Sequence, residues 1–325
     1  MRGLSLEELD VSADALDEDV LRSPDVDRFC SSSAWILSAA HAFGPTRQSF
    51  VHRGEHGWLT AMRTETEQGT ACIEPLEASW GMGCPLIGAD PLALAEELVA
   101  HLAPRRDWRV TLLTGLSGDG ALLPALLRAL PRWIRRGFSE PAVRRIASLE
   151  GGVDGFLSRR TRNFRKALRA AERDAAAAGI TFEPLVVHTK EEAAQSYARI
   201  CAIEAQSWKG AEGVGINQGP MHDFYAGMLP RLARHGRQRT WFARQGDRDV
   251  AYCLGAVFDG QYRGLQFSFD RAFERHSLGS LLQLRQIEAL VDEGVRRYDL
   301  GQDLEYKRRW AEDAFETALL VLVNR

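Results

Sequence analysis

The 325-residue sequence predicts a mixed α/β fold built from two tandem copies of one unit. Strand-like and helix-like patterns alternate along the chain, and the same order of elements recurs at an offset of about 190 residues. A segment rich in glycine, residues 138–155, separates the copies. We therefore expect one domain over residues 1–145 and another over residues 146–325, each with a mixed, largely antiparallel sheet flanked by helices.

The first copy follows an acidic, weakly periodic stretch, residues 1–25, which we expect to be partly disordered. A helix is predicted over residues 33–42, and strands over 48–53, 57–63 and 70–75. After a loop over 80–88, Asp90 is a candidate N-cap and Pro91 suits the first turn of a helix that runs to about residue 102. A strand over 108–116 and a helix near 121–130 complete this copy.

The second copy repeats this order. Strands are predicted over 240–244, 250–259 and 262–270, with glycine-containing turns between them. A loop over 273–280 leads to a helix over 280–293, and a strand over 297–300 follows. The start of this helix carries a Gly-Ser pair and free N–H groups, a local structure that suits phosphate binding.

Composition restricts the classes of function. An apolar content of 45%, a charged content of 26% and a net charge of −3 are those of a globular protein without a field that attracts DNA. The five cysteines form no CxxC pair and the histidines have no metal-ligand spacing, so we expect no metal. We also expect no membrane insertion, because no apolar window is long enough, and a cytoplasmic location, because the N-terminus lacks a signal-peptide pattern.

A helix predicted over residues 156–177 is strongly basic. Arg162, Arg165 and Lys166 belong to a set of cations that falls on one face of this helix, opposite an apolar face. Two interpretations stay open: a solvated face, or a surface that binds the phosphates of a substrate. The second is favoured by the mutual repulsion of the cations, which a bound anion would offset.

At these motifs the sequence resembles the GNAT acyltransferase superfamily. The tandem order resembles the Fem-type branch, and the second half resembles the BioF2-like, cellulose-biosynthesis-associated acetyltransferase domain family. The segments that carry the resemblance cover about half of the chain and come in the right order: 158–166, 204–210, 277–282, 298–301 and 306–310. The resemblance implies a donor-binding second domain and a first domain that has lost donor binding and serves as scaffold and acceptor wall.

The donor loop departs from the usual GNAT pattern. Its residues His276, Ser277, Gly279 and Ser280 are the candidates for donor binding, together with Gly255 on the strand expected to carry the donor. His276 and Leu281 stand where the pattern has other residues, and a leucine crowds the close backbone approach that glycine permits. The donor is thus either an acyl-CoA held in a less conventional way or an aminoacyl-tRNA.

Acyl transfer to an amine also requires proton transfer. Glu204 is a candidate base and Trp208 a candidate wall of the acceptor site. The alternatives are that Trp208 lies in the core and that Glu204 and Lys209 are ordinary surface charges, which is the favoured interpretation for Lys209. Asp299 lies at the end of a strand, where ligands gather in α/β sheets, and acts either as a base or by orienting Lys307 or a nearby arginine. Tyr306 is a candidate proton donor, and the Fem-type resemblance implies a role for Lys307.

The sequence therefore predicts an N-acyltransferase that uses an acyl-CoA and an amine of a small molecule or peptide. The first alternative is a Fem-type transferase that uses aminoacyl-tRNA, with tRNA on the basic helix. The second is a non-catalytic protein that senses an acyl-CoA or serves as a scaffold, since a fold alone does not establish activity.

Overall fold

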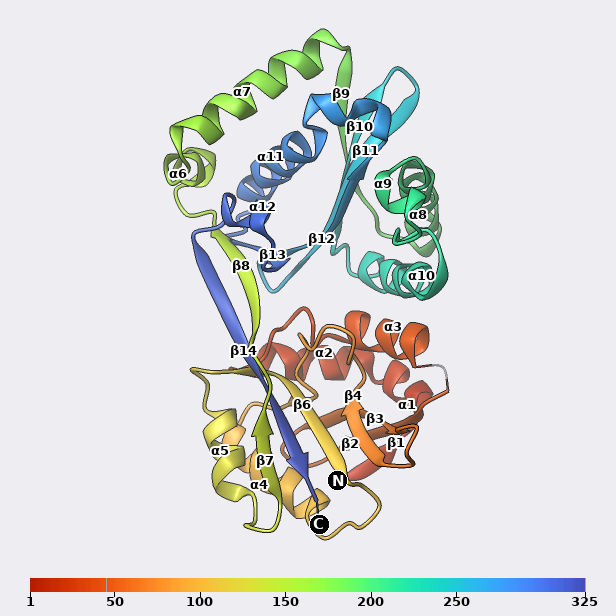
Figure 1. The fold of residues 1–325 in the computed structure, drawn as a ribbon, viewed down its shortest axis with the longest axis vertical. Coiled ribbons are helices and arrows are strands. Elements are labelled where there is room, and N and C mark those ends of the chain that lie inside the picture. Colours follow the sequence, from red (N-terminus) through yellow and green to blue (C-terminus); the bar gives the residue numbers. More distant parts are fainter. Residues whose placement is uncertain (45, 325) are drawn as a thin grey trace. The chain divides into compact units, whose positions relative to one another are not determined.

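The structure, a computed structural model, describes residues 1–44 and 46–324. The chain forms two compact units, the first made of Met1–Val143 with Glu316–Arg325 and the second of Arg144–Phe315 (Figure 1). The predicted second domain ran to residue 325. The last strand instead pairs with strands of the first unit, so the sequence boundary needs this correction at the C-terminal end.

The first unit contains a mixed sheet with strand order β1-β2-β3-β4-β6-β14, in which β5 also pairs with β3 and β7 with β14. Its elements are β1 (Arg2–Leu4), α1 (Leu6–Val11), α2 (Ala13–Arg22), α3 (Ser33–Phe43), β2 (Gln48–Arg53), β3 (Trp58–Glu65), β4 (Ala71–Pro75), β5 (Leu86–Ile87), α4 (Pro91–Leu102), β6 (Val110–Ser117), α5 (Leu122–Ala129), β7 (Arg135–Phe138) and β14 (Asp313–Val323).

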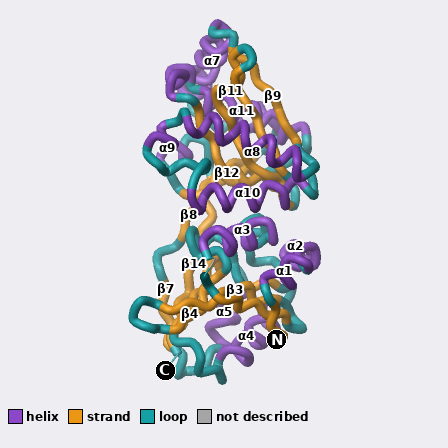
Figure 2. Tube along the Cα trace, turned by 90° about the vertical axis from the view of Figure 1, so that its right-hand side faces the viewer, coloured by secondary structure: helices purple, strands orange, loops and turns teal. Residues whose placement is uncertain are grey.

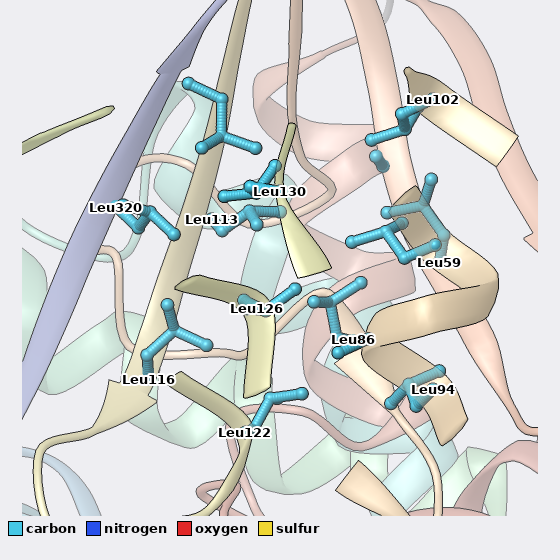
Figure 3. Close-up of a cluster of buried hydrophobic side chains, with 14 of the residues drawn as sticks. Leu59, Leu86, Leu94, Leu102, Leu113, Leu116, Leu122, Leu126, Leu130 and Leu320 are labelled. Carbon is cyan, nitrogen blue, oxygen red and sulfur yellow. The ribbon is translucent and has the colours of Figure 1, made fainter. Parts of the chain in front are cut away.

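Leucines from the sheet and from α4 and α5 form the core of the first unit (Figure 3). Leu113, Leu126 and Leu320 are fully buried in this cluster. Leu320 comes from β14, at the C-terminal end of the chain, so this core includes side chains from both ends of the sequence.

The second unit contains the strand order β8-β13-β12-β11-β10-β9. Its elements are β8 (Ala142–Ser148), α6 (Gly152–Ser158), α7 (Arg162–Ala177), β9 (Ile180–Val186), α8 (Lys190–Ala205), α9 (Trp208–Ala211), α10 (Gly219–Ala233), β10 (Gln238–Gln245), β11 (Arg248–Phe258), β12 (Gln261–Phe269), the 3₁₀ helix η1 (Arg271–His276), α11 (Leu278–Asp292), β13 (Arg297–Gln302) and α12 (Glu305–Arg308).

Helices cover both faces of the sheet in the second unit. The group α8 to α10 packs on one face, through contacts of α8 with β11 and β12 and of α10 with β10 (Figure 2). On the other face α11 packs against β10, β11 and β12, and α7 packs against α11 and β9 (Figure 1). The second unit is therefore a three-layer α/β/α arrangement.

The two units repeat one another, as the sequence predicted. In the first unit, β4 and β6 are parallel and are joined through α4; in the second, β12 and β13 are parallel and are joined through α11. Each parallel pair follows a hairpin of antiparallel strands, β3–β4 and β11–β12. The mixed fold of two tandem units is confirmed by this correspondence.

Three local predictions are wrong. Residues 1–25 contain β1, α1 and α2 instead of disorder, because Ser5 and Glu8 form a capping box and Leu9, Leu16 and Val20 are fully buried. The basic helix does not run unbroken over 156–177: Thr161 caps a new helix at Arg162, so α6 and α7 are separate. The last strand, β14, was not foreseen.

Candidate active site

The parallel strands of the second unit diverge beyond three paired positions. The last pair of opposite residues is Arg263 and Asp299. Beyond this pair β12 continues to Phe269 and β13 continues to Gln302, but their residues no longer pair with each other. We call this place the β12–β13 divergence. Unpaired strand ends of a parallel sheet are where α/β proteins bind ligands, because main-chain groups and side chains are both available there.

Two lysines lie at the β12–β13 divergence. The Lys209 ammonium donates to Gln266 Oε1 and to the Phe267 carbonyl oxygen, both at 2.9 Å. Lys307 Nζ and Arg263 Nη2 both lie close to Gly301. A Cβ added at Gly301 would be 3.4 Å from Lys307 Nζ and 3.3 Å from Arg263 Nη2. Burial and the charge of Arg263 lower the pKa of Lys307 to about 8, although Asp299 acts in the opposite direction. Burial also lowers the pKa of Lys209.

Asp299 is buried between two arginines. Its Oδ2 is 3.1 Å from Arg144 Nη1 and 2.7 Å from Arg263 Nη1, and its Oδ1 accepts the Gly301 N–H at 2.7 Å. Burial opposes ionisation of this carboxyl group, but the two arginines and the N–H donor outweigh it and lower its pKa. Asp299 is therefore a fixed anion that holds Arg263 beside Lys307.

Glu204 is fully buried near the C-terminal end of α8. Its Oε2 accepts the Tyr252 hydroxyl at 3.0 Å and its Oε1 accepts the Ile216 N–H at 3.3 Å, so it is not an ordinary surface charge. Its negative charge favours the charged form of Lys209. Trp208, in α9, is 47% exposed, which excludes the core alternative and leaves its indole available to a ligand.

Tyr306 precedes Lys307 in α12. Its ring packs edge-on against Phe267 of β12, with centroids 5.8 Å apart. Burial raises the pKa of Tyr306 to about 12, so its hydroxyl keeps its proton at neutral pH. This aromatic contact packs α12, which carries Lys307, against the part of β12 beyond its last pair with β13.

The donor loop enters α11 through Ser277, which has a φ of 54° and is exposed. Gly279 allows α11 to approach β12 closely, since a Cβ there would lie 2.8 Å from the Phe267 ring. Ser280 donates its N–H to the Ser277 carbonyl oxygen at 3.0 Å. His276 is buried, with Nδ1 2.5 Å from Asp174 Oδ2 and with Nε2 accepting from Arg275, so its ring is engaged within the protein.

Gly255 lies at a break in strand register. The pairing of β11 with β12 shifts between Leu254 and Gly255, so a bulge is present where the sequence suggested one. A Cβ on Gly255 would meet the Tyr262 hydroxyl at 2.1 Å and the Arg263 carbonyl at 2.5 Å. The packing of Tyr262 therefore requires glycine at this position.

The basic helix α7 divides its charges between two environments. Arg165 donates to the Leu157 carbonyl, whereas Arg162 and Lys166 are exposed, as are Arg169 and Arg173. The acids of this helix are engaged elsewhere: Glu172 pairs with Arg285, and Asp174 pairs with His276. We call the exposed set Arg162, Lys166, Arg169 and Arg173 the α7 basic face.

In the first unit, the loop before α4 corresponds to the donor loop before α11 in the second unit, and its N–H groups bind a carboxylate of the first unit itself. Glu77 is buried and accepts N–H groups from four consecutive residues: Trp80, Gly81, Met82 and Gly83. Asp90 caps α4 by accepting from the N–H groups of Leu92 and Ala93, as predicted. The N–H donors that an anion needs are therefore bound to side chains of the unit itself.

Sequence reasoning missed several residues of this site. It treated Lys209 as a surface charge and did not single out Arg144, Arg263 or Gln266. An arginine inside a strand of the core needs a buried partner, and this was a signal for Arg263. Asp299, the partner of both arginines, is distant from them in the sequence, so the pairing itself was not predictable.

No group of three or more histidine, cysteine, aspartate or glutamate side chains within residues 1–44 and 46–324 is arranged to hold a metal ion. No helix in this part of the chain has the length and apolar character required to cross a membrane.

One known family matches the part of the chain that holds this site. Residues 162–308 match the family described as Acetyltransferase (GNAT) domain, a segment that includes both lysines, Glu204, Tyr306 and Asp299. The match lies within the second unit. No curated protein matches the chain.

Solved structures extend the likeness to both units. A conserved protein of unknown function from Bacteroides thetaiotaomicron has a TM-score of 0.64 at 10% identity, covering 99% of this chain and 98% of that one. FemX has a TM-score of 0.62 at 13% identity, with coverage of 94% and 95%. The C-terminal domain of a putative lysylphosphatidylglycerol synthetase from Agrobacterium fabrum has 0.56 at 14%, with 94% and 91%. The chain therefore has a GNAT-superfamily, Fem-like fold.

Proposed function

We propose that this protein is an N-acyltransferase that holds its acyl donor at the β12–β13 divergence of the second unit. The observation that supports this most is the pair of half-buried lysines with lowered pKa, Lys209 and Lys307. The charged groups that act there include four cations and three carboxylates: Lys209, Lys307, Arg144 and Arg263, with Glu204, Asp299 and Asp303. Such an excess of positive charge favours a ligand or a transition state that carries negative charge.

The proposed donor is an acyl-CoA thioester. Its acyl arm would follow the unpaired edge of β12, and its phosphates would meet the N–H groups at the start of α11, near Ser277, Gly279 and Ser280. In this arrangement His276 has a structural role, because its ring contacts Asp174 of α7. The first unit, whose N–H cradle is filled by Glu77, would serve as a scaffold without a donor.

In the proposed reaction, the amine nitrogen attacks the thioester carbonyl carbon and forms the carbon–nitrogen bond, and the carbon–sulfur bond then breaks and releases the thiol of coenzyme A. The Lys307 ammonium stabilises the oxyanion. Tyr306 gives its proton to the leaving sulfur, and Glu204 takes the proton that the amine loses. Asp299 positions Arg263 and does not accept a proton, since two arginines hold it ionised. Exposed Trp208 lines the amine's approach.

The alternative donor is an aminoacyl-tRNA. Two observations favour it: the α7 basic face, and a fold shared over both units with FemX and with a lysylphosphatidylglycerol synthetase domain. Four phosphate contacts would give a slope of log affinity against log salt of about −3. Charge reversal at Arg162 and Lys166 would reduce that slope by about two and would leave acyl-CoA binding unchanged.

Calorimetry with acetyl-CoA and longer acyl-CoA thioesters tests the donor, and release of free thiol in the presence of amines tests turnover. We expect a dissociation constant in the micromolar to submillimolar range. The rate of thiol release should fall at least hundredfold in Lys307→Met. The exposed Lys190→Met variant is the matched control. No acyl-CoA binding would contradict the donor assignment, and binding without release for any amine would favour a non-catalytic sensor.

A further inference from the structure

A second basic surface lies in the first unit, at the connection between α5 and β7 (Figure 1). The exposed residues there include both arginine and aromatic side chains: Arg128, Arg132, Trp133, Arg136 and Phe138. We call this set the α5–β7 surface. Trp133 is 50% exposed and Phe138 is 56% exposed, which is unusual for large apolar side chains on a charged surface.

The segment that carries this surface has no negative charge of its own, because no acidic residue occurs between Asp119 and Glu140 in the sequence. The residues of β14 that pair with β7 are Leu320, Val321, Leu322 and Val323, all apolar. Arg136 donates to the Leu130 carbonyl oxygen, so its guanidinium keeps its full charge.

Strand register places Arg136 and Phe138 on one side of the sheet, and it places Arg135, opposite Val323, on the other side. Phe138 is opposite Leu320, and Arg136 is opposite Leu322, and directly opposed residues of antiparallel strands share a face. Both leucines belong to the core beneath α5. Arg136 and Phe138 therefore lie beside α5, which carries exposed Arg128 near its end, and the loop with Arg132 and Trp133 joins them.

We propose that the α5–β7 surface docks the first unit on an anionic phospholipid surface. Tryptophan is favoured at the level of lipid headgroups, where its ring is partly apolar and its N–H is hydrated. Arginines beside it gain attraction to anionic lipids. The arginines on each of two copies would repel each other across a symmetric contact, so a second copy of this chain fits less well.

Cosedimentation with vesicles tests the proposal. Wild-type protein should sediment with vesicles of equal parts phosphatidylglycerol and phosphatidylcholine at low salt, and less at high salt or with phosphatidylcholine alone. Arg132→Gln with Arg136→Gln should lower the partition coefficient about thirtyfold, about fivefold for each charge. Trp133→Ala with Phe138→Ala should lower it about tenfold and leave its salt dependence intact.

The matched control is Arg162→Gln with Arg169→Gln, which removes the same charge from the α7 basic face. This control should sediment like wild type, and circular dichroism should show that all variants are folded. An absence of sedimentation with anionic vesicles at low salt would overturn the proposal. An equal loss in the α7 control, or no loss in the α5–β7 variants, would also overturn it. Binding of a single-stranded oligonucleotide without binding of vesicles would assign the surface to nucleic acid instead.

Discussion

Lys307 and Asp299 show how burial acts on single charges at this site. Burial and the charge of Arg263 lower the pKa of Lys307 to about 8, because they outweigh the opposite effects of Asp299 and Asp303. Asp299 has two arginines and an N–H donor, so it stays ionised despite burial. The same desolvation thus gives one group that titrates near neutral pH and one that does not.

The pH dependence of transfer should reveal the protonated form of Lys307. The ammonium is lost as pH rises through about 8, so the wild-type rate should decline there relative to that of Lys307→Arg, whose guanidinium stays charged. Titration of the acceptor amine is common to both enzymes and cancels in the ratio of their rates. Superimposable pH–rate profiles of the wild-type and Lys307→Arg enzymes would show that the charge of Lys307 does not contribute to the transfer reaction.

Replacing Asp299 should weaken folding. Asp299→Asn removes the carboxylate that pairs with the buried Arg144 and Arg263, and we expect a loss of about 3–5 kcal/mol in the free energy of unfolding at pH 7. The folded-state pKa of Asp299 lies below its ordinary value of 3.8, so this contribution is complete above that pH and is lost as pH falls further. Urea unfolding at several pH values measures this difference. The exposed Asp223→Asn variant should change stability little.

At the scale of elements, the contact between α11 and β12 depends on Gly279. A Cβ there would meet the Phe267 ring at 2.8 Å, and Phe267 also contacts Tyr306. Gly279→Ala should therefore cost about 1–3 kcal/mol in urea unfolding, and Phe267→Leu should recover part of the loss. Gly118→Ala, where an added Cβ meets nothing within 4 Å, should be neutral. Equal effects at both glycines would contradict this account of Gly279.

Elements with clear local signals were predictable. The strand over 48–53 matches β2, and the Asp90 cap with Pro91 matches the start of α4, because turn and cap chemistry is local. The break at Thr161 was missed because the residues on both sides have helical propensity. The site divided in the same way: Tyr306 and Lys307 stood in a motif, whereas the role of Lys209 depends on Gln266 and Phe267, a contact that only folding creates.

At the scale of the whole molecule, the first unit is completed by the end of the chain. The strand β14 pairs with both β6 and β7, and its Leu320 and Leu322 are buried in the leucine core. No local pattern predicts that a distant strand will join this sheet. Sequence periodicity therefore predicted the repeat, but it did not predict that β14 joins the sheet of the first unit.

A chain that ends at Phe315 should lose the first unit and keep the second. Removal of Leu320 and Leu322 opens the core beneath α4 and α5, at a cost of several kcal/mol. Hydrogen exchange should then become fast in β6 and stay slow in β11. Retained protection in β6 would show that β14 is dispensable for this core.

Hydrogen exchange with and without saturating acetyl-CoA tests the central claim most directly, since it locates the donor without assuming an acceptor. We predict slower exchange in residues 264–269 of β12 and at the start of α11, with no change in residues 76–88 of the first unit. Slower exchange in the first unit, or no change anywhere in the presence of acetyl-CoA, would contradict the proposal that the second unit holds an acyl-CoA at the β12–β13 divergence.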